Sequence, residues 1–206
     1  DNTAVGRNAL NQNTTASGHV AVGSSALDAN TTGSQNTALG TSAMAANTTG
    51  DYSVAVGFEA LKANTTASNN TALGYRALLA NTTGTRNLAI GMNAYDASDT
   101  ENDNIAIGFA AMTTNTAGGT KLLAIGNYAL DAATSGDKNI GVGYAALGAV
   151  TSGSENVAVG DNALSLVTTT NGNTAVGAQA GEAVVGASNT AVGQYALKAA
   201  TTTNDN

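Results

Sequence analysis

Small and aliphatic residues recur along this chain at a fixed spacing. A typical copy is Thr71-Ala72-Leu73-Gly74, and its glycine returns 17 residues apart, with one interval of 18 and one of 16. These glycines are Gly6, Gly23, Gly40, Gly57, Gly74, Gly91, Gly108, Gly126, Gly143, Gly160, Gly177 and Gly193. A short period sustained over twelve copies predicts a stacked repeat architecture, in which one copy alone cannot bury enough apolar surface to fold.

Each copy divides into three expected elements. The three residues before the glycine are too few for a helix and rich in aliphatic and β-branched types, which predicts a short strand. The glycine permits a bend, and the following Ala-Leu-x-Ala, as at 77–80, predicts a second short strand. Asn-Thr-Thr-Gly, as at 81–84, then predicts the return turn.

The strand before the glycine carries no charge on either of its faces in any copy. Such strands are typically buried on both sides, so we expect one face to line the core and the other to pack against partner chains. The fold expected from the repeat is an all-β, parallel β-solenoid (β-roll) of twelve coils, in which residues 1–206 form a single repeat domain. Because the copies run in phase from Asn2 to Asn206, we expect a segment of a longer fibrous protein.

Composition excludes several classes of partner. The chain carries a net charge of −7 with only seven Lys and Arg, which argues against binding to nucleic acid or to an anionic membrane surface. Cysteine is absent, which excludes disulfides and thiolate metal sites, and we expect no cofactor. No apolar run approaches the roughly 20 residues that span a bilayer, so we expect no membrane insertion in this segment.

Copies such as Asn36-Thr37-Ala38-Leu39-Gly40 and Ser53-Val54-Ala55-Val56-Gly57 resemble the head repeats of YadA-type trimeric autotransporter adhesins. The 17-residue form with Asn-Thr-Thr-Gly, as at 47–50, is also similar to repeats in tail-fibre-type proteins of phages. The resemblance implies left-handed parallel β-rolls assembled as homotrimers. It also implies an extracellular location, on a cell surface or a virion tail, and a host-surface glycan or protein as partner.

Two groups of residues are candidate sites. Phe58, Tyr75, Phe109 and Tyr144 follow the glycine directly and would align as a stripe, which either stacks on sugar rings or seals a seam between chains. The acidic residues Asp96, Asp99, Glu101 and Asp103 supply oxygen ligands that suit calcium, although a solvated acidic turn is the simpler interpretation.

The asparagines and the one histidine each allow a functional and a structural interpretation. The aligned Asn13, Asn30, Asn47, Asn64 and Asn81 are formal N-glycosylation acceptors, but stacked coils predict an amide ladder instead. The sole histidine, His19, stands where most copies have Asn, so we interpret it as a substituted turn residue rather than a catalytic base.

The leading functional hypothesis is a structural and adhesive fibre segment that presents many weak contacts on a stiff scaffold. The competing class is an ice-binding solenoid that uses threonine ladders, although adjacent threonines of a strand face opposite ways. An enzyme, such as a polysaccharide lyase, would need a cluster of acidic or basic groups in a cleft, and the sequence predicts none.

Overall fold

The computed structural model describes residues 1–115 and 118–199, and this part is all-β, with twelve three-residue strands and no helix. The predicted parallel β-solenoid is confirmed, whereas the predicted end of the last copy at Asn206 lies outside the described residues. The strands are β1 (Thr3–Val5), β2 (Val20–Val22), β3 (Thr37–Leu39), β4 (Val54–Val56), β5 (Thr71–Leu73), β6 (Leu88–Ile90), β7 (Ile105–Ile107), β8 (Leu123–Ile125), β9 (Ile140–Val142), β10 (Val157–Val159), β11 (Thr174–Val176) and β12 (Thr190–Val192).

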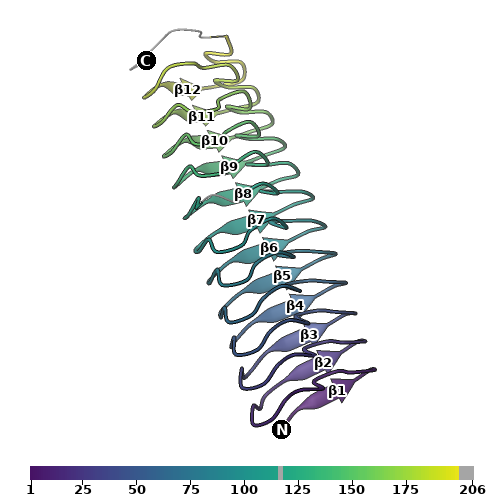
Figure 1. Ribbon diagram of the computed structural model, residues 1–206. Helices are drawn as coiled ribbons and strands as arrows, with labels where there is room; N and C mark the ends of the chain where they lie inside the picture. The colour runs from purple at the N-terminus through teal and green to yellow at the C-terminus, as the bar shows by residue number, and fades with distance from the viewer. Residues whose placement is uncertain (116–117, 200–206) are drawn as a thin grey trace. The chain divides into compact units, whose positions relative to one another are not determined.

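The strands fall into two compact units, residues 1–103 with β1–β6 and residues 104–206 with β7–β12. Within each unit, every strand pairs in parallel with the next strand along the chain, as the labelled arrows of Figure 1 show. The register is uniform, so that Ala38 of β3 lies beside Ala55 of β4 and Leu39 lies beside Val56. Equivalent residues of successive copies therefore form columns that run along each unit.

The core of each coil is narrow and consists of small and medium-sized side chains. The central strand residue points inward, as does the Ala-Leu or Ala-Met pair that begins three residues after the glycine. In one coil, Ala72, Ala77 and Leu78 are all fully buried. Alanine at the strand centre lets the two sides of the coil approach closely, and the larger Leu or Met fills the remaining space.

The prediction of a second strand after the glycine is wrong. Residues 75–80 and their equivalents form consecutive turns, and the second and fourth residues after the glycine, such as Arg76 and Leu78, have φ near +50°. An extended strand directs successive side chains to opposite faces. Ala77 and Leu78 are adjacent and both buried. The backbone adopts a left-handed conformation at alternate residues, and this directs both side chains inward.

The repeating glycine is required by both conformation and space. Gly74 has φ +141°, a region that residues with a side chain rarely adopt. A Cβ at Gly74 would lie 2.4 Å from the carbonyl oxygen of Gly91 in the next coil. The predicted bend at this glycine is confirmed, and the close approach of neighbouring coils explains why no copy replaces it.

Each coil has buried inner positions and exposed outer positions, and this difference generates a prediction. Leu78→Ala removes a fully buried side chain, so we expect it to lower the free energy of unfolding by about 2–5 kcal/mol. Leu73→Ala removes the same atoms from a side chain that is 45 % exposed, and we expect a change within about 0.5 kcal/mol in dilute solution. Urea unfolding followed by circular dichroism measures both, and equal losses would contradict the assignment of the core.

Candidate functional site

The outward side of the strands is an uncharged, mainly aliphatic surface. We define the strand face as the first and third residues of each strand, and none of these residues is buried in the chain described here. Leu39 is 46 % exposed and Leu73 45 %. Each unit carries its own part of this face. The sequence predicted two uncharged faces, and the structure shows that alanine takes the inner one.

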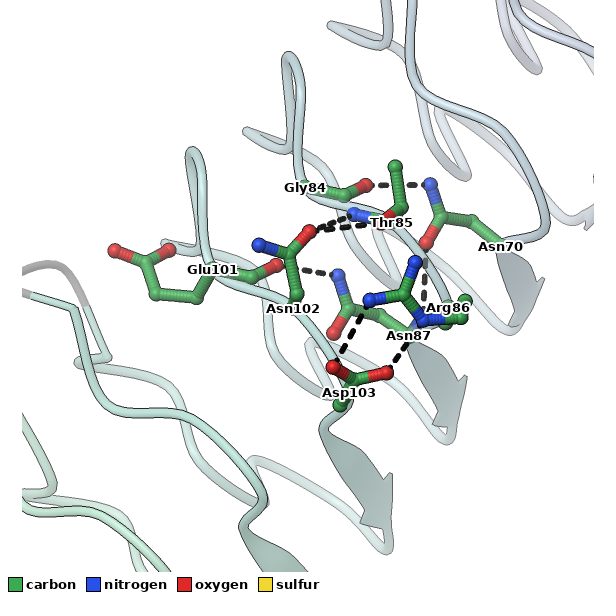
Figure 2. A network of polar contacts seen from close by, with 8 residues as sticks. All are labelled: Asn70, Gly84, Thr85, Arg86, Asn87, Glu101, Asn102 and Asp103. Carbon is green, nitrogen blue, oxygen red and sulfur yellow. Dashed lines mark hydrogen bonds and ion pairs between the residues drawn. The ribbon is translucent and has the colours of Figure 1, made fainter.

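Polar residues that precede each strand tie neighbouring coils together. In Figure 2, the Asn70 amide Nδ2 donates to the Gly84 carbonyl in the return turn of the same copy at 2.7 Å, and Asn70 Oδ1 accepts from the Asn87 backbone N–H of the next copy at 2.9 Å. Asn87 repeats the pattern by donating to the Glu101 carbonyl at 2.7 Å. We call this set the pre-strand column: Asn2, His19, Asn36, Ser53, Asn70, Asn87, Asn104, Leu122, Asn139, Asn156, Asn173 and Asn189. Sequence reasoning missed its bridging role, although the recurrence of Asn was a signal of it.

The two polar replacements in unit 1 preserve the acceptor of this column. His19 Nδ1 accepts from the Asn36 backbone N–H at 3.2 Å, and Ser53 Oγ accepts from the Asn70 backbone N–H at 3.2 Å. His19 is almost fully buried, and burial is the main cause that lowers its pKa below the ordinary value of 6.5. The ring is thus held neutral between coils, which favours a structural role for it.

The predicted asparagine ladder is confirmed. Asn47 Nδ2 donates to Asn30 Oδ1 at 2.7 Å, and Asn64 Nδ2 donates to Asn47 Oδ1 at 2.7 Å. Each amide also donates to a carbonyl of its own turn, as Asn64 does to Ala67 at 3.0 Å. These three asparagines and Asn81 are fully buried, so their amides are not available to a glycosylating enzyme in the folded chain.

In unit 2, the same column changes from polar to apolar. After Asn115, the equivalent positions are Ala133, Val150, Val167 and Val184, all of them buried. An amide in such a run would lack the partner amides that satisfy it in unit 1. The column thus consists of stacked amides in unit 1, interrupted at Ser98, and of packed aliphatic groups after Asn115 in unit 2.

The paired threonines of the return turn play different roles. The first donates its hydroxyl to the next coil, as Thr48 Oγ1 does to the Thr65 carbonyl at 2.9 Å. The second, such as Thr49 or Thr66, is exposed. The turns of unit 1 thus present one outward rank of threonine, whereas an ice-matching plane of the Thr-x-Thr kind has two.

The structure does not bring the candidate calcium ligands together. Asp103 forms a two-pronged ion pair with Arg86, with atoms 2.6 and 3.0 Å apart, and the Glu101 side chain points away from that pair (Figure 2). Glu101 is buried, and its carboxylate accepts hydrogen bonds from the backbone N–H groups of Asp99 and Thr100 at 3.0 and 3.1 Å. Asp99 in turn accepts from the Thr82 hydroxyl, and Asp96 belongs to an earlier turn.

The aromatic candidates form short runs of rings. Phe58 and Tyr75 stack with ring centres 5.4 Å apart. Phe109 and Tyr144 are joined through Tyr128, which meets them edge to face at 5.3 and 5.8 Å. Sequence reasoning omitted Tyr128 because it stands second rather than first after its glycine. A shallow depression of about 490 Å³ opens beside Tyr128 and Tyr144.

Metal-binding clusters and membrane-spanning helices are absent from the described residues. Among the described residues, no three His, Cys, Asp or Glu side chains are grouped so that they could hold a metal ion. The part of the chain that the structure covers has no helix with the length and hydropathy of a membrane span. In comparisons with known proteins, no family model, no curated protein and no solved structure matched this chain.

The amide ladder yields a second prediction. Asn64→Val leaves Asn47 Oδ1 and the Ala67 carbonyl without their Asn64 donor, and it removes one of the two acceptors of Asn81 Nδ2, which still donates to the Gly84 carbonyl. Each buried polar group left without a partner costs about 1–3 kcal/mol. We therefore expect a large fall in the urea midpoint, although valine is the native residue of this column in unit 2. Thr66→Val, on the exposed side of the same turn, is the matched control and should have little effect. A midpoint that Asn64→Val leaves unchanged would refute the ladder.

The buried histidine generates a third prediction, on pH. Its pKa is lower in the folded chain than in the unfolded chain, so the unfolded state binds more protons below about pH 6.5. The stabilisation is complete above that pH and declines as the pH falls, by up to about 1.4 kcal/mol for one pH unit. Urea unfolding at about pH 7.5 and about pH 5.5 should show this loss, because most carboxylates titrate lower.

The variant His19→Asn is the control, since Asn is the usual residue of the pre-strand column and supplies an acceptor to the same N–H. We expect its stability to fall less between the two pH values than that of the parent chain. An identical fall in both proteins would show that other groups govern the acid sensitivity.

Proposed function

We propose that this chain is a structural and adhesive segment of an extracellular fibre, in which several copies associate through their strand faces. The observation that carries the proposal is the strand face itself. Its third-position residues Leu39, Leu73, Ile125, Val159 and Val176 are 37–46 % exposed and lie in uncharged columns. Contiguous apolar surface of this kind usually marks an interaction site, and parallel strands are usually covered on both sides.

A second copy of this chain is the occupant that best matches the face. The face repeats along each unit with the period of the coils, so a partner with the same period makes equivalent contacts at every coil. Three chains and a left-handed coil are part of the proposal on the strength of the resemblance to trimeric adhesin heads. A cell surface or a virion tail is the location that the same resemblance supports.

The proposed mechanism is multivalent presentation on a stiff scaffold. Each coil is fixed to the next by backbone and side-chain hydrogen bonds, such as those of Asn70 and Asn64. A repeated outward side chain is then held at a constant spacing, and many weak contacts to a host glycan or protein act together. Charge supports this partner class, because a net charge of −7 disfavours nucleic acid.

Ice binding is the competing function. It would need a continuous rank of outward threonines on the strand face. Thr37 and Thr71 point outward from the first position of their strands, but Val20, Val54, Leu88 and Ile105 occupy that position in neighbouring or later coils. The outward threonines therefore form no continuous rank. Thermal hysteresis of the purified chain separates the two functions, since a fibre segment has none.

Our fourth prediction tests self-association. The triple variant Leu39→Lys, Val54→Lys, Leu73→Lys places charges on the strand face, at side chains that are all at least 38 % exposed and outside the core. We expect the parent chain to form a trimer of 20.1 kDa subunits in light scattering at about 50 μM, and the variant to be a monomer with an unchanged circular dichroism spectrum.

The matched control is Thr32→Lys, Thr49→Lys, Thr66→Lys, which adds the same charge on exposed turn residues. It should assemble as the parent does. A parent chain that is monomeric at every concentration, or a strand-face variant that assembles normally, would overturn the proposal.

A further inference from the structure

The depression beside Tyr128 and Tyr144 arises where two small residues, Gly148 and Ser165, follow each other in one column. The fifth residue after the glycine is Asp131, Gly148, Ser165 and Glu182 in four successive coils of unit 2. Larger side chains occupy most of the equivalent positions in unit 1, namely Asn11, Asp28, Lys62, Leu79 and Asp96. Gly148 and Ser165 thus leave a recess of about 490 Å³ with a carboxylate at each end.

One side of the recess is aromatic and accessible. Tyr144 is 53 % exposed and Tyr128 37 %, and their ring planes are 77° apart, so the rings offer two differently oriented surfaces. Leu166, 60 % exposed, also lines the recess. Exposed aromatic rings bind molecules that combine an apolar face with polar edges.

The recess has an acceptor-only carboxylate at each end, and its tyrosine, Asn162 and Ser165 side chains can both donate and accept hydrogen bonds. The Asp131 carboxylate accepts a hydrogen bond from the Thr113 hydroxyl, and Glu182 is paired with Lys198 at 3.4 Å. A carboxylate has about four acceptor sites, so both groups have capacity for further donors. Among the described residues that line the recess, none is Lys or Arg, which disfavours an anionic ligand.

We propose that this recess binds a neutral oligosaccharide of pyranose sugars. The C–H face of a pyranose ring matches an exposed tyrosine, and its hydroxyls are donors that match Asp131 and Glu182. The four coils span roughly 14 Å at about 4.8 Å per coil, which suits a short chain of sugar rings rather than a single ring. The volume is within the range of small-ligand pockets.

This inference supplies a ligand class for the proposed adhesive function and rests on that function for its biological use. The recess and the strand face use different residues, because every lining residue lies outside the strands. Sugar binding and self-association are therefore measured independently, and one can fail without the other.

The test is calorimetric titration of the full chain with three neutral sugars, maltotriose, cellotriose and triacetylchitotriose, and with trigalacturonate as the anionic counterpart. We expect saturable binding of at least one neutral sugar, with a dissociation constant of about 1 mM, and none of trigalacturonate. Tyr144→Ala should weaken binding about tenfold, and Tyr144→Phe should retain it. Ser165→Gln, which places a larger side chain in the recess and keeps both tyrosines, should also weaken it.

Tyr75→Ala is the matched control, because Tyr75 has the equivalent place in unit 1 but stacks on Phe58 and lies beneath Arg76. It should bind the sugar as the parent does. The proposal is overturned if no neutral sugar binds at concentrations up to about 10 mM, if Tyr144→Ala and Tyr75→Ala behave alike, or if trigalacturonate binds best. A change in subunit assembly caused by Tyr144→Ala would instead assign the rings to a chain–chain seam.

Discussion

The structure depends on one constraint: the backbone N–H and C=O groups of each coil must find their hydrogen-bond partners in the neighbouring coils. A coil holds only three strand residues and a series of turns, so few of its N–H and C=O groups pair within the same coil. The Leu78 N–H, for example, donates to the Ala94 carbonyl of the next coil at 3.0 Å. Buried backbone groups without partners are costly, and this cost fixes the coils in register.

The same constraint explains which positions vary. In unit 1, pre-strand residues face a backbone N–H of the next coil, so Asn is replaced there by His19 and Ser53, which also have acceptors, whereas Leu122 of unit 2 has none. Repeating glycines such as Gly23, Gly74 and Gly143 admit no Cβ because a carbonyl of the next coil lies too close. Outward positions face no such demand, and there the chain places tyrosines, carboxylates and the aliphatic strand face. The outer columns can thus vary without breaking the contacts between coils, while the inner columns hold the coils together.

Period and residue type were sufficient to predict the solenoid, the strands, the bend at the glycine and the amide ladder. The second strand was predicted wrongly because a pattern of Ala and Leu does not reveal backbone twist, and adjacent inward side chains such as Ala77 and Leu78 require alternating φ. The recess was not predicted because it depends on two small residues, Gly148 and Ser165, that are adjacent only once the coils stack. The acidic residues were close in sequence, yet Glu101 turns inward while Asp103 pairs with Arg86.

Amide hydrogen exchange, followed residue by residue, tests this dependence of each coil on the next most directly. The amides of Leu27, Met44, Leu61 and Leu78 lie in turns, outside any strand, and donate to the following coil. We expect these amides to exchange as slowly as those of the strands, because both open only when neighbouring coils separate. Rapid exchange at these turn amides, with protection confined to the strands, would contradict the account.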